Sequence, residues 1–239
     1  MFFLLHLIFY SLTKHKRSHF YCGLIQKRDI CIVLNSRHFY CGVTDQKLGG
    51  CDNVVEFGHM FPADIEPDTA SALIKHVTDA LTAIGYSNGV AHVEVRLTPQ
   101  GWRLIEINPR IGGNYISKLV ESVTGISPLT QMIQIALGEA PAIPGKNHDL
   151  KRPQSAAVAY VLPSQPGFLS GHDGRQEMEC LPGILQYHLG PAGKVVSPPD
   201  DNDCYLGYVI CVDSEGLGAG RMASKALSFL KPQIDETSL

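Results

Sequence analysis

The sequence has no long hydrophobic run, no excess of basic residues and no paired cysteine motif, and each absence removes a class of protein. No stretch of roughly 18 or more apolar residues occurs among the 239 residues, so no membrane-spanning helix is predicted. The formal net charge of −3 offers no basic surface for nucleic acid. Seven cysteines, an odd number without a C-x-x-C pair, argue against a zinc centre or a disulfide framework. We therefore expect free thiols in a reducing compartment, the cytoplasm.

What remains is the composition of a globular protein with an unusual beginning. Hydrophobic residues make up 44% of the chain and charged residues 18%, which suits a folded protein rather than a disordered one. The opening "MFFLLHLIFYSL" is apolar, but its cations follow instead of preceding it and no small-residue cleavage site is evident. It is therefore a poor signal peptide. We set residues 1–28 apart as an atypical N-terminal segment.

The rest of the chain alternates short strands with helices, which predicts an α+β protein. Strands are expected at 29–36, at 38–46 and within "VVEFGHMFPADI". A helix should open at Glu66 and end near Gly85, because apolar residues recur between them at helical spacing.

Further along, "GVAHVEVRL" and "GWRLIEIN" form a predicted strand hairpin, and helices are expected at 115–123 and 128–137. The composition of 138–149 is that of a linker. From Arg152 the pattern changes to short strands and a final helix at about 217–231. We therefore predict one domain at 29–142 and a smaller α+β unit at 150–239.

Counting residues outward from the hairpin loop predicts which side chains share a face. Pro99 suits the second position of a type I turn, and Gly101 suits the left-handed residue that completes a three-residue loop. Thr98 would then oppose Trp102, which makes Glu94 oppose Glu106. Directly opposed residues share a face. The polar face would carry His92, Glu94, Arg96, Glu106 and Asn108. The apolar face would carry Val93, Val95, Leu97, Ile105 and Ile107.

The opposed carboxylates of Glu94 and Glu106 suggest a metal site. Like charges in opposed positions have Cβ atoms about 4.5–5.5 Å apart and destabilise a strand pair. A divalent cation between them would reverse that effect. Mg²⁺ prefers carboxylate and amide oxygens and completes its shell with water and phosphate, so Asn108 is a suitable third ligand. Two alternatives stay open: a solvent-facing hairpin with ordinary polar residues, or an acid neutralised by Arg96.

The segment after the hairpin favours the metal site over these alternatives. Arg110 leaves the strand end beside the polar face, where a guanidinium is well placed to bind a phosphate or a carboxylate. Gly112 and Gly113 permit close backbone approach and precede a predicted helix, whose N-terminus favours anions.

The stretch "HVEVRLTPQGWRLIEINPRIGG" resembles the metal-binding end of ATP-grasp ligases, through its Glu…Glu-x-Asn spacing. "VVEFGHMFPADI" before it and the strand-rich tail after it narrow the resemblance to the L-amino-acid ligase branch, over about residues 29–239. The resemblance implies that 29–142 is the C-terminal half of an ATP-grasp domain, an antiparallel sheet with packed helices. Residues 150–239 would be the C-terminal ligase subdomain.

Carried over to single residues, the resemblance assigns the nucleotide side of a site. Glu94, Glu106 and Asn108 would be ligands of Mg²⁺, or of Mn²⁺ in its place, and would thereby hold ATP. Arg110 would be the catalytic residue that holds the transferring phosphate or a substrate carboxylate.

The resemblance also assigns an amino-acid pocket. Glu56 and His59 would line it, and Gly113 and Asn114 would lie where the family shapes it. The alternatives are that His59 is a structural loop histidine and that Glu56 is an exposed acid at a strand end.

The implied reaction joins a carboxylate to an amine. ATP would phosphorylate the carboxylate of an amino acid or another acid, and an amine would attack the acylphosphate to form an amide. Two other functions stay open: a carboxylase-like or purine-biosynthesis-like ATP-grasp enzyme, and a binding module of the same fold that does not catalyse.

The resemblance further implies a larger unit. ATP-grasp ligases of this branch have an N-terminal α/β domain, a glycine-rich loop and lysines that grip the nucleotide. About 28 residues precede the first matched strand here, without a glycine-rich phosphate loop. We expect a C-terminal half of the enzyme with a missing N-terminal half as its partner, and a homodimer is left open.

Overall fold

The computed structural model of the protein describes residues 26–34, 36–49, 55–142, 153–198 and 202–235, with side chains from residue 36 onward. The first part contains β1 (Gln26–Leu34), β2 (Arg37–Gly49), β3 (Val55–Phe61), α2 (Pro67–Ala83), β4 (Gly89–Thr98), β5 (Gly101–Asn108), α3 (Ile116–Thr124) and α4 (Pro128–Ala136). The second part contains β6 (Ser155–Val161), β7 (Gly167–Asp173), α5 (Arg175–Glu179), β8 (Ile184–Leu189), β9 (Lys194–Val196), the 3₁₀ turn η1 (Asn202–Cys204), β10 (Gly207–Asp213), α6 (Ala219–Phe229) and β11 (Lys231–Asp235).

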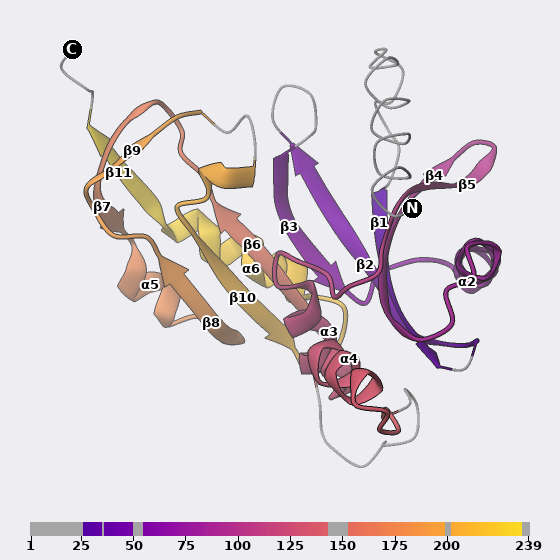
Figure 1. Ribbon diagram of the computed structural model, residues 1–239. Coiled ribbons are helices and arrows are strands. Elements are labelled where there is room, and N and C mark those ends of the chain that lie inside the picture. The colour runs from indigo at the N-terminus through magenta and orange to yellow at the C-terminus, as the bar shows by residue number, and fades with distance from the viewer. Residues whose placement is uncertain (1–25, 35, 50–54, 143–152, 199–201, 236–239) are drawn as a thin grey trace.

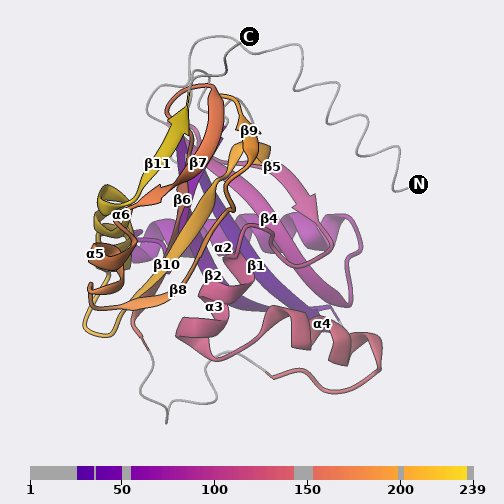
Figure 2. The same cartoon turned by 90° about the vertical axis from the view of Figure 1, so that its left-hand side faces the viewer.

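Eight strands form one large sheet, in the order β5-β4-β1-β2-β3-β6-β10-β8, and every neighbouring pair is antiparallel. Helices α3 and α4 lie in front of it in Figure 1, and α6 lies behind it. Strands β11, β7 and β9 form a second, smaller sheet, seen above α5 and α6 in Figure 2. The predicted α+β class, an antiparallel sheet with packed helices, is confirmed.

The large sheet runs without interruption through both predicted domains, because β3 pairs with β6. The division at 142 and 150 stays a prediction, since most of the linker lies outside the described residues. The core nevertheless has separate parts. One gathers α2 against β4 and β5, one gathers α3 against β6 and β10, and one gathers α6 against the other face of β6 and β10, together with residues of the second sheet.

Helix α2 shows why its sequence folds as predicted. Leu73, Val77 and Leu81 recur every four residues, so they lie on one face, and all are fully buried against the back of β4. Burial of each such side chain stabilises the fold by about 1.5–3 kcal/mol. Gly85 follows the helix with φ +70°, a left-handed conformation that glycine adopts without steric cost.

The predicted hairpin loop is wrong, although the pairing it led to is confirmed. Thr98 opposes Gly101, so the loop has two residues instead of three. The Thr98 hydroxyl donates to the Gly101 carbonyl at 2.8 Å and closes this tighter turn. A β-bulge between Glu94 and Val95 then adds the missing residue on β5, and Glu94 opposes Glu106 as expected.

The bulge also changes the apolar face. Leu104 opposes Val95 and packs with the core around α2, where Ile105 was expected.

The helices predicted at 115–123 and 128–137 are confirmed as α3 and α4. Short elements α5 and β11 were not predicted. No helix in the described ranges is long and apolar enough to cross a membrane. The described cysteines are free thiols: Cys41, Cys180, Cys204 and Cys211.

Candidate functional site

Four polar residues of β4 and β5 form what we call the hairpin cluster: His92, Glu94, Glu106 and Asn108. Glu94 opposes Glu106, and His92 opposes Asn108, so the four lie on one face of the strand pair. His92 Nε2 lies 3.6 Å from a carboxylate oxygen of Glu94. His92 is only 1% exposed and the Glu94 side chain 14%, so the alternative of an ordinary solvent-facing hairpin is wrong.

The donors of the hairpin cluster fit a hard divalent cation. Two opposed carboxylates and one amide supply the oxygen ligands that Mg²⁺ takes. The amide nitrogen of Asn108 is buried and makes no hydrogen bond within the described structure. Across the described residues, no group of three or more His, Cys, Asp or Glu side chains could enclose a metal alone. Mg²⁺ usually keeps positions for water and substrate phosphate, so two carboxylates and one amide can be a sufficient protein contribution to its shell.

A second group, the β3 cluster, is built around the carboxylate of Glu56. A bulge between Lys47 and Leu48 of β2 interrupts the alternation of β3, and Glu56 and His59 thereby meet although they are three residues apart. The carboxylate accepts hydrogen bonds from Gln46 Nε2 at 2.8 Å and from Asn114 Nδ2, and His59 Nε2 lies at 3.1 Å. The β3 cluster consists of Gln46, Glu56, His59 and Asn114.

Both alternatives for the β3 cluster are wrong. Glu56 is 4% exposed and so is not an exposed strand-end acid. His59 is 3% exposed within β3 and so is not a loop histidine. A buried carboxylate is costly unless it is well paired, and Glu56 is paired on both oxygens.

Tyrosines that the sequence did not single out surround the β3 cluster. The Tyr160 hydroxyl donates to the Asn114 carbonyl at 2.8 Å, and the Tyr205 hydroxyl donates to the Glu56 carbonyl at 2.9 Å. Their two rings stack with centroids 4.1 Å apart. These tyrosines come from β6 and from the segment before β10, so only the long-range pairing of β3 with β6 brings them here.

The two clusters lie on the same face of the large sheet. Glu94 opposes position 28 of β1, which opposes Thr44 of β2; Gln46 follows two residues along and opposes His59. Three strand spacings separate β4 from β3, about 14 Å. The connection from β5 to α3 carries Asn108 at its start and Asn114 at its end, and it crosses in front of the sheet (Figure 1).

This connection also holds Arg110, Gly113 and two strained residues. The Arg110 guanidinium is exposed and donates to the neighbouring Ile111 carbonyl at 2.9 Å. Gly113 is exposed, and nothing within 4 Å would meet a Cβ added there. Asn114 and Tyr115 have φ of 49° and 63°, in the left-handed region. A tyrosine there is an outlier of the kind that clusters at functional sites.

Tyr115 is 38% exposed and packs on Tyr208, with ring centroids 4.1 Å apart. Burial and a hydrogen bond with Tyr208 raise the pKa of Tyr115 to about 12. The phenol of Tyr115 is therefore neutral at physiological pH.

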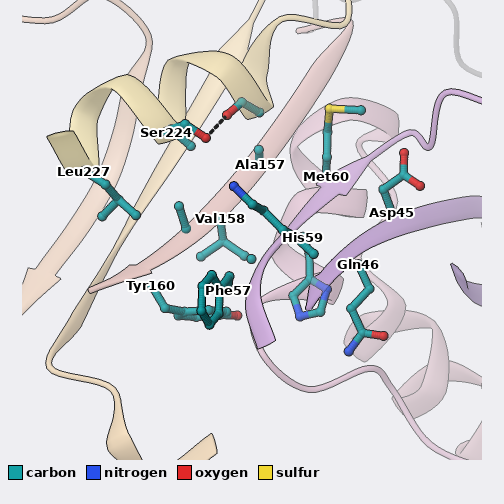
Figure 3. Close-up of a pocket in the computed structure, with 15 residues that line it drawn as sticks. Asp45, Gln46, Phe57, His59, Met60, Ala157, Val158, Tyr160, Ser224 and Leu227 are labelled. Atoms are coloured by element: carbon teal, nitrogen blue, oxygen red, sulfur yellow. Dashed lines mark hydrogen bonds between the residues drawn. The ribbon is translucent and has the colours of Figure 1, made fainter. Parts of the chain in front are cut away.

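A cavity of about 310 Å³ lies beside this site, between α6 and strands β2, β3 and β6. Met60, Ser224 and Leu227 line it, together with Asp45 (Figure 3). The side chains of Gln46 and His59 turn to the other side of β3 in that view, away from α6. Apart from His59, which borders the cavity, the residues predicted for the site do not line it.

The arrangement of strands and helices is the ATP-grasp fold. Two solved structures share it with a TM-score of 0.75. One is the L-amino acid ligase from Bacillus licheniformis, 20% identical over 89% of this chain and 52% of that one. The other is phosphoribosylglycinamide synthetase from Anaerococcus prevotii, 15% identical over 88% of this chain and 53% of that one.

Family models match both parts of the chain. The model of the ATP-grasp domain matches residues 35–118, and the model of L-amino acid ligase C-terminal domain 2 matches residues 159–235. The chain belongs to the ATP-grasp superfamily, in its L-amino-acid ligase branch.

Curated relatives agree with this assignment. Human carnosine synthase 1 is 29% identical over 68% of this chain and 20% of its own length. Dapdiamide A synthase from Enterobacter agglomerans is 29% identical over 50% of this chain and 29% of its own length. The chain thus spans less than a third of these relatives and about half of the two solved structures.

Proposed function

We propose that this chain forms the metal- and phosphate-binding part of an ADP-forming ligase that joins an amino acid or another carboxylate to an amine. One observation carries the proposal. An opposed pair of carboxylates with an adjacent amide shares a sheet face with a buried, fully paired Glu56. The names of the relatives, carnosine synthase and L-amino acid ligase, support amino acids as substrates.

Glu94, Glu106 and Asn108 would hold Mg²⁺, or Mn²⁺ in its place. The bound cation would neutralise charge on the ATP phosphates as the phosphoryl group transfers. The protein's contribution is to fix three oxygen donors on paired strands, where the backbone hydrogen bonds restrict their movement.

Arg110 would act at the same place from the adjoining connection. Its guanidinium is exposed and makes no ion pair with a described carboxylate, so it is available to a phosphate or to a substrate carboxylate. The substrate carboxylate would attack the γ-phosphorus of ATP and ADP would leave. An amine would then attack the acyl carbon and expel phosphate, and Arg110 would stabilise negative charge in both steps.

The β3 cluster would define the amino-acid side. Glu56 and His59 present one buried acid and one imidazole, and Asn114 ties them to the connection that contains Gly112 and Gly113. A paired carboxylate is suited to receive the ammonium group of an amino acid. Gly113, which has open space around it, would leave room for the substrate.

Binding of ADP tests the proposal on the chain as it exists. Calorimetric titration of the parent with ADP should show binding that depends on Mg²⁺. Glu106→Ala should weaken it at least about tenfold, which corresponds to about 1.4 kcal/mol. Glu121→Ala, on the exposed side of α3 where Glu121 pairs with Lys118, is the matched control and should bind as the parent does.

Three outcomes separate the candidates. If Glu106→Ala binds Mg²⁺-ADP as well as the parent does, the metal site is refuted. If the parent binds Mg²⁺-ADP but releases no phosphate with any amino-acid pair, the chain acts as a binding module under those conditions. Phosphate release with particular pairs would identify the substrates.

Cytoplasmic location is also proposed, and the free thiols support it.

A further inference from the structure

His92 is a buried histidine whose ring nitrogens have no hydrogen-bond partner in the described structure. It is 1% exposed and lies in the middle of β4, flanked by the buried apolar residues Ala91 and Val93. A neutral imidazole has one donor and one acceptor, and burying either without a partner is unfavourable. An apolar side chain would stabilise this position better. A polar group kept under such conditions calls for an explanation.

The contacts of His92 point toward the hairpin cluster. Its Nε2 lies 3.6 Å from the Glu94 carboxylate, slightly beyond hydrogen-bond distance. Its other nitrogen, Nδ1, lies beside Gly112, where an added Cβ would come within 3.2 Å of it. Across the strand pair stands Asn108, whose amide nitrogen is also buried and without a partner. His92 thus lies beside both the Glu94 carboxylate and Gly112 in the connection to α3.

We infer that His92 is a positioning residue, which orients Glu94 for the cation and fixes the backbone at Gly112. This inference rests on the proposed metal site. A shift of a few tenths of an ångström would let Nε2–H donate to Glu94. That bond would hold the carboxylate in one orientation, as outer-shell partners do for metal ligands. Nδ1 would remain as an acceptor on the side of Gly112.

Mn²⁺ binding, measured by electron paramagnetic resonance on the 239-residue chain with ADP, tests this role without turnover. His92→Leu should weaken Mn²⁺ binding about tenfold or more, the usual effect of losing an outer-shell partner. The same substitution should leave the midpoint of thermal unfolding unchanged or raise it, because it removes unpaired polar atoms from the interior. Replacing a residue with a merely structural role would not weaken Mn²⁺ binding while leaving the midpoint of thermal unfolding unchanged or raised.

His92→Gln is the second variant, since its side-chain amide can donate where Nε2 does. It should recover most of the affinity that His92→Leu loses. His172→Leu is the matched control: His172 is half-buried in β7, also has a ring nitrogen without a partner, and should leave Mn²⁺ binding unchanged.

The outcomes separate the inference from the proposed function. A parent chain that shows no Mn²⁺ binding overturns both. A parent that binds, with His92→Leu binding within about twofold of it, overturns the role of His92 alone. A folded His92→Gln that binds no better than His92→Leu also overturns it, whatever the stability of the leucine variant.

Discussion

The two polar clusters on the front of the sheet differ in how their groups are paired. In the β3 cluster, Glu56 receives donors on both carboxylate oxygens, and the surrounding tyrosines bond the backbone. In the hairpin cluster, the buried His92 and the half-buried Asn108 have side-chain nitrogens that are buried without partners in the described structure. The Glu56 carboxylate is thus satisfied by protein donors, although Gln46 Oε1 in the same cluster is buried without a partner, whereas the hairpin cluster leaves nitrogens of His92 and Asn108 unsatisfied within the described structure.

This difference concerns how each cluster contributes to the stability of the fold. A satisfied buried network stabilises and rigidifies its surroundings. A cluster with opposed acids and unpaired polar groups lowers stability and is kept where function requires it. Variants of the two clusters should therefore affect stability in opposite directions.

Glu56→Ala should have the largest effect. It would leave the amides of Gln46 and Asn114 and the His59 ring without their acceptor in a buried place. We expect the free energy of unfolding to fall by about 3–5 kcal/mol. Denaturant unfolding measures the change, with Glu121→Ala as an exposed control that should stay within about 0.5 kcal/mol of the parent. A loss below about 1 kcal/mol would show that the network contributes little to the fold.

Glu106→Gln should have a smaller effect of the opposite sign. It removes one of two opposed negative charges and keeps the size of the side chain. Without metal, we expect the unfolding free energy to rise by up to about 1 kcal/mol. With Mg²⁺ and ADP present, the parent should gain stability that the variant lacks, because a ligand stabilises only the state that binds it. A clear loss of stability in Glu106→Gln without metal would contradict this expectation, because both clusters would then stabilise the fold.

The hairpin cluster could be predicted from the sequence because two local errors cancelled. The loop is one residue shorter than the turn residues Pro99 and Gly101 suggested, and the bulge near Glu94 adds one back. Between the loop and the bulge the register differs from the prediction: Leu104 takes the place on the apolar face expected for Ile105, and Trp102 opposes Leu97 in the core around α2 instead of Thr98.

The β3 cluster could be predicted only in part, for a physical reason. Glu56, His59 and Asn114 were expected to share a pocket, and the structure does bring them together. Gln46 and Tyr160 were missed, since they enter through pairing between strands far apart in the sequence. A period of two along a single strand does not reveal its neighbours in the sheet. Helix α5 and strand β11 were missed because such segments are too short to show a measurable hydrophobic period.

The smallest expected effect concerns Tyr115, in the strained connection that joins the clusters. Burial and the hydrogen bond with Tyr208 raise its pKa to about 12, above the value of about 10 in an unfolded chain. The neutral phenol therefore favours the folded state fully below pH of about 10, and this contribution is lost as the pH rises through about 12. Tyr115→Phe should make the decline of stability over this alkaline range shallower and remove a late step from the absorbance titration of tyrosinate. Tyr40→Phe, whose hydroxyl bonds α2 on the other face, is the control and should keep that late step. If the late step survives in Tyr115→Phe, it does not come from Tyr115. The side chain of Tyr115 would then be open to solvent, and packing against β10 would not explain the strained backbone at Asn114 and Tyr115.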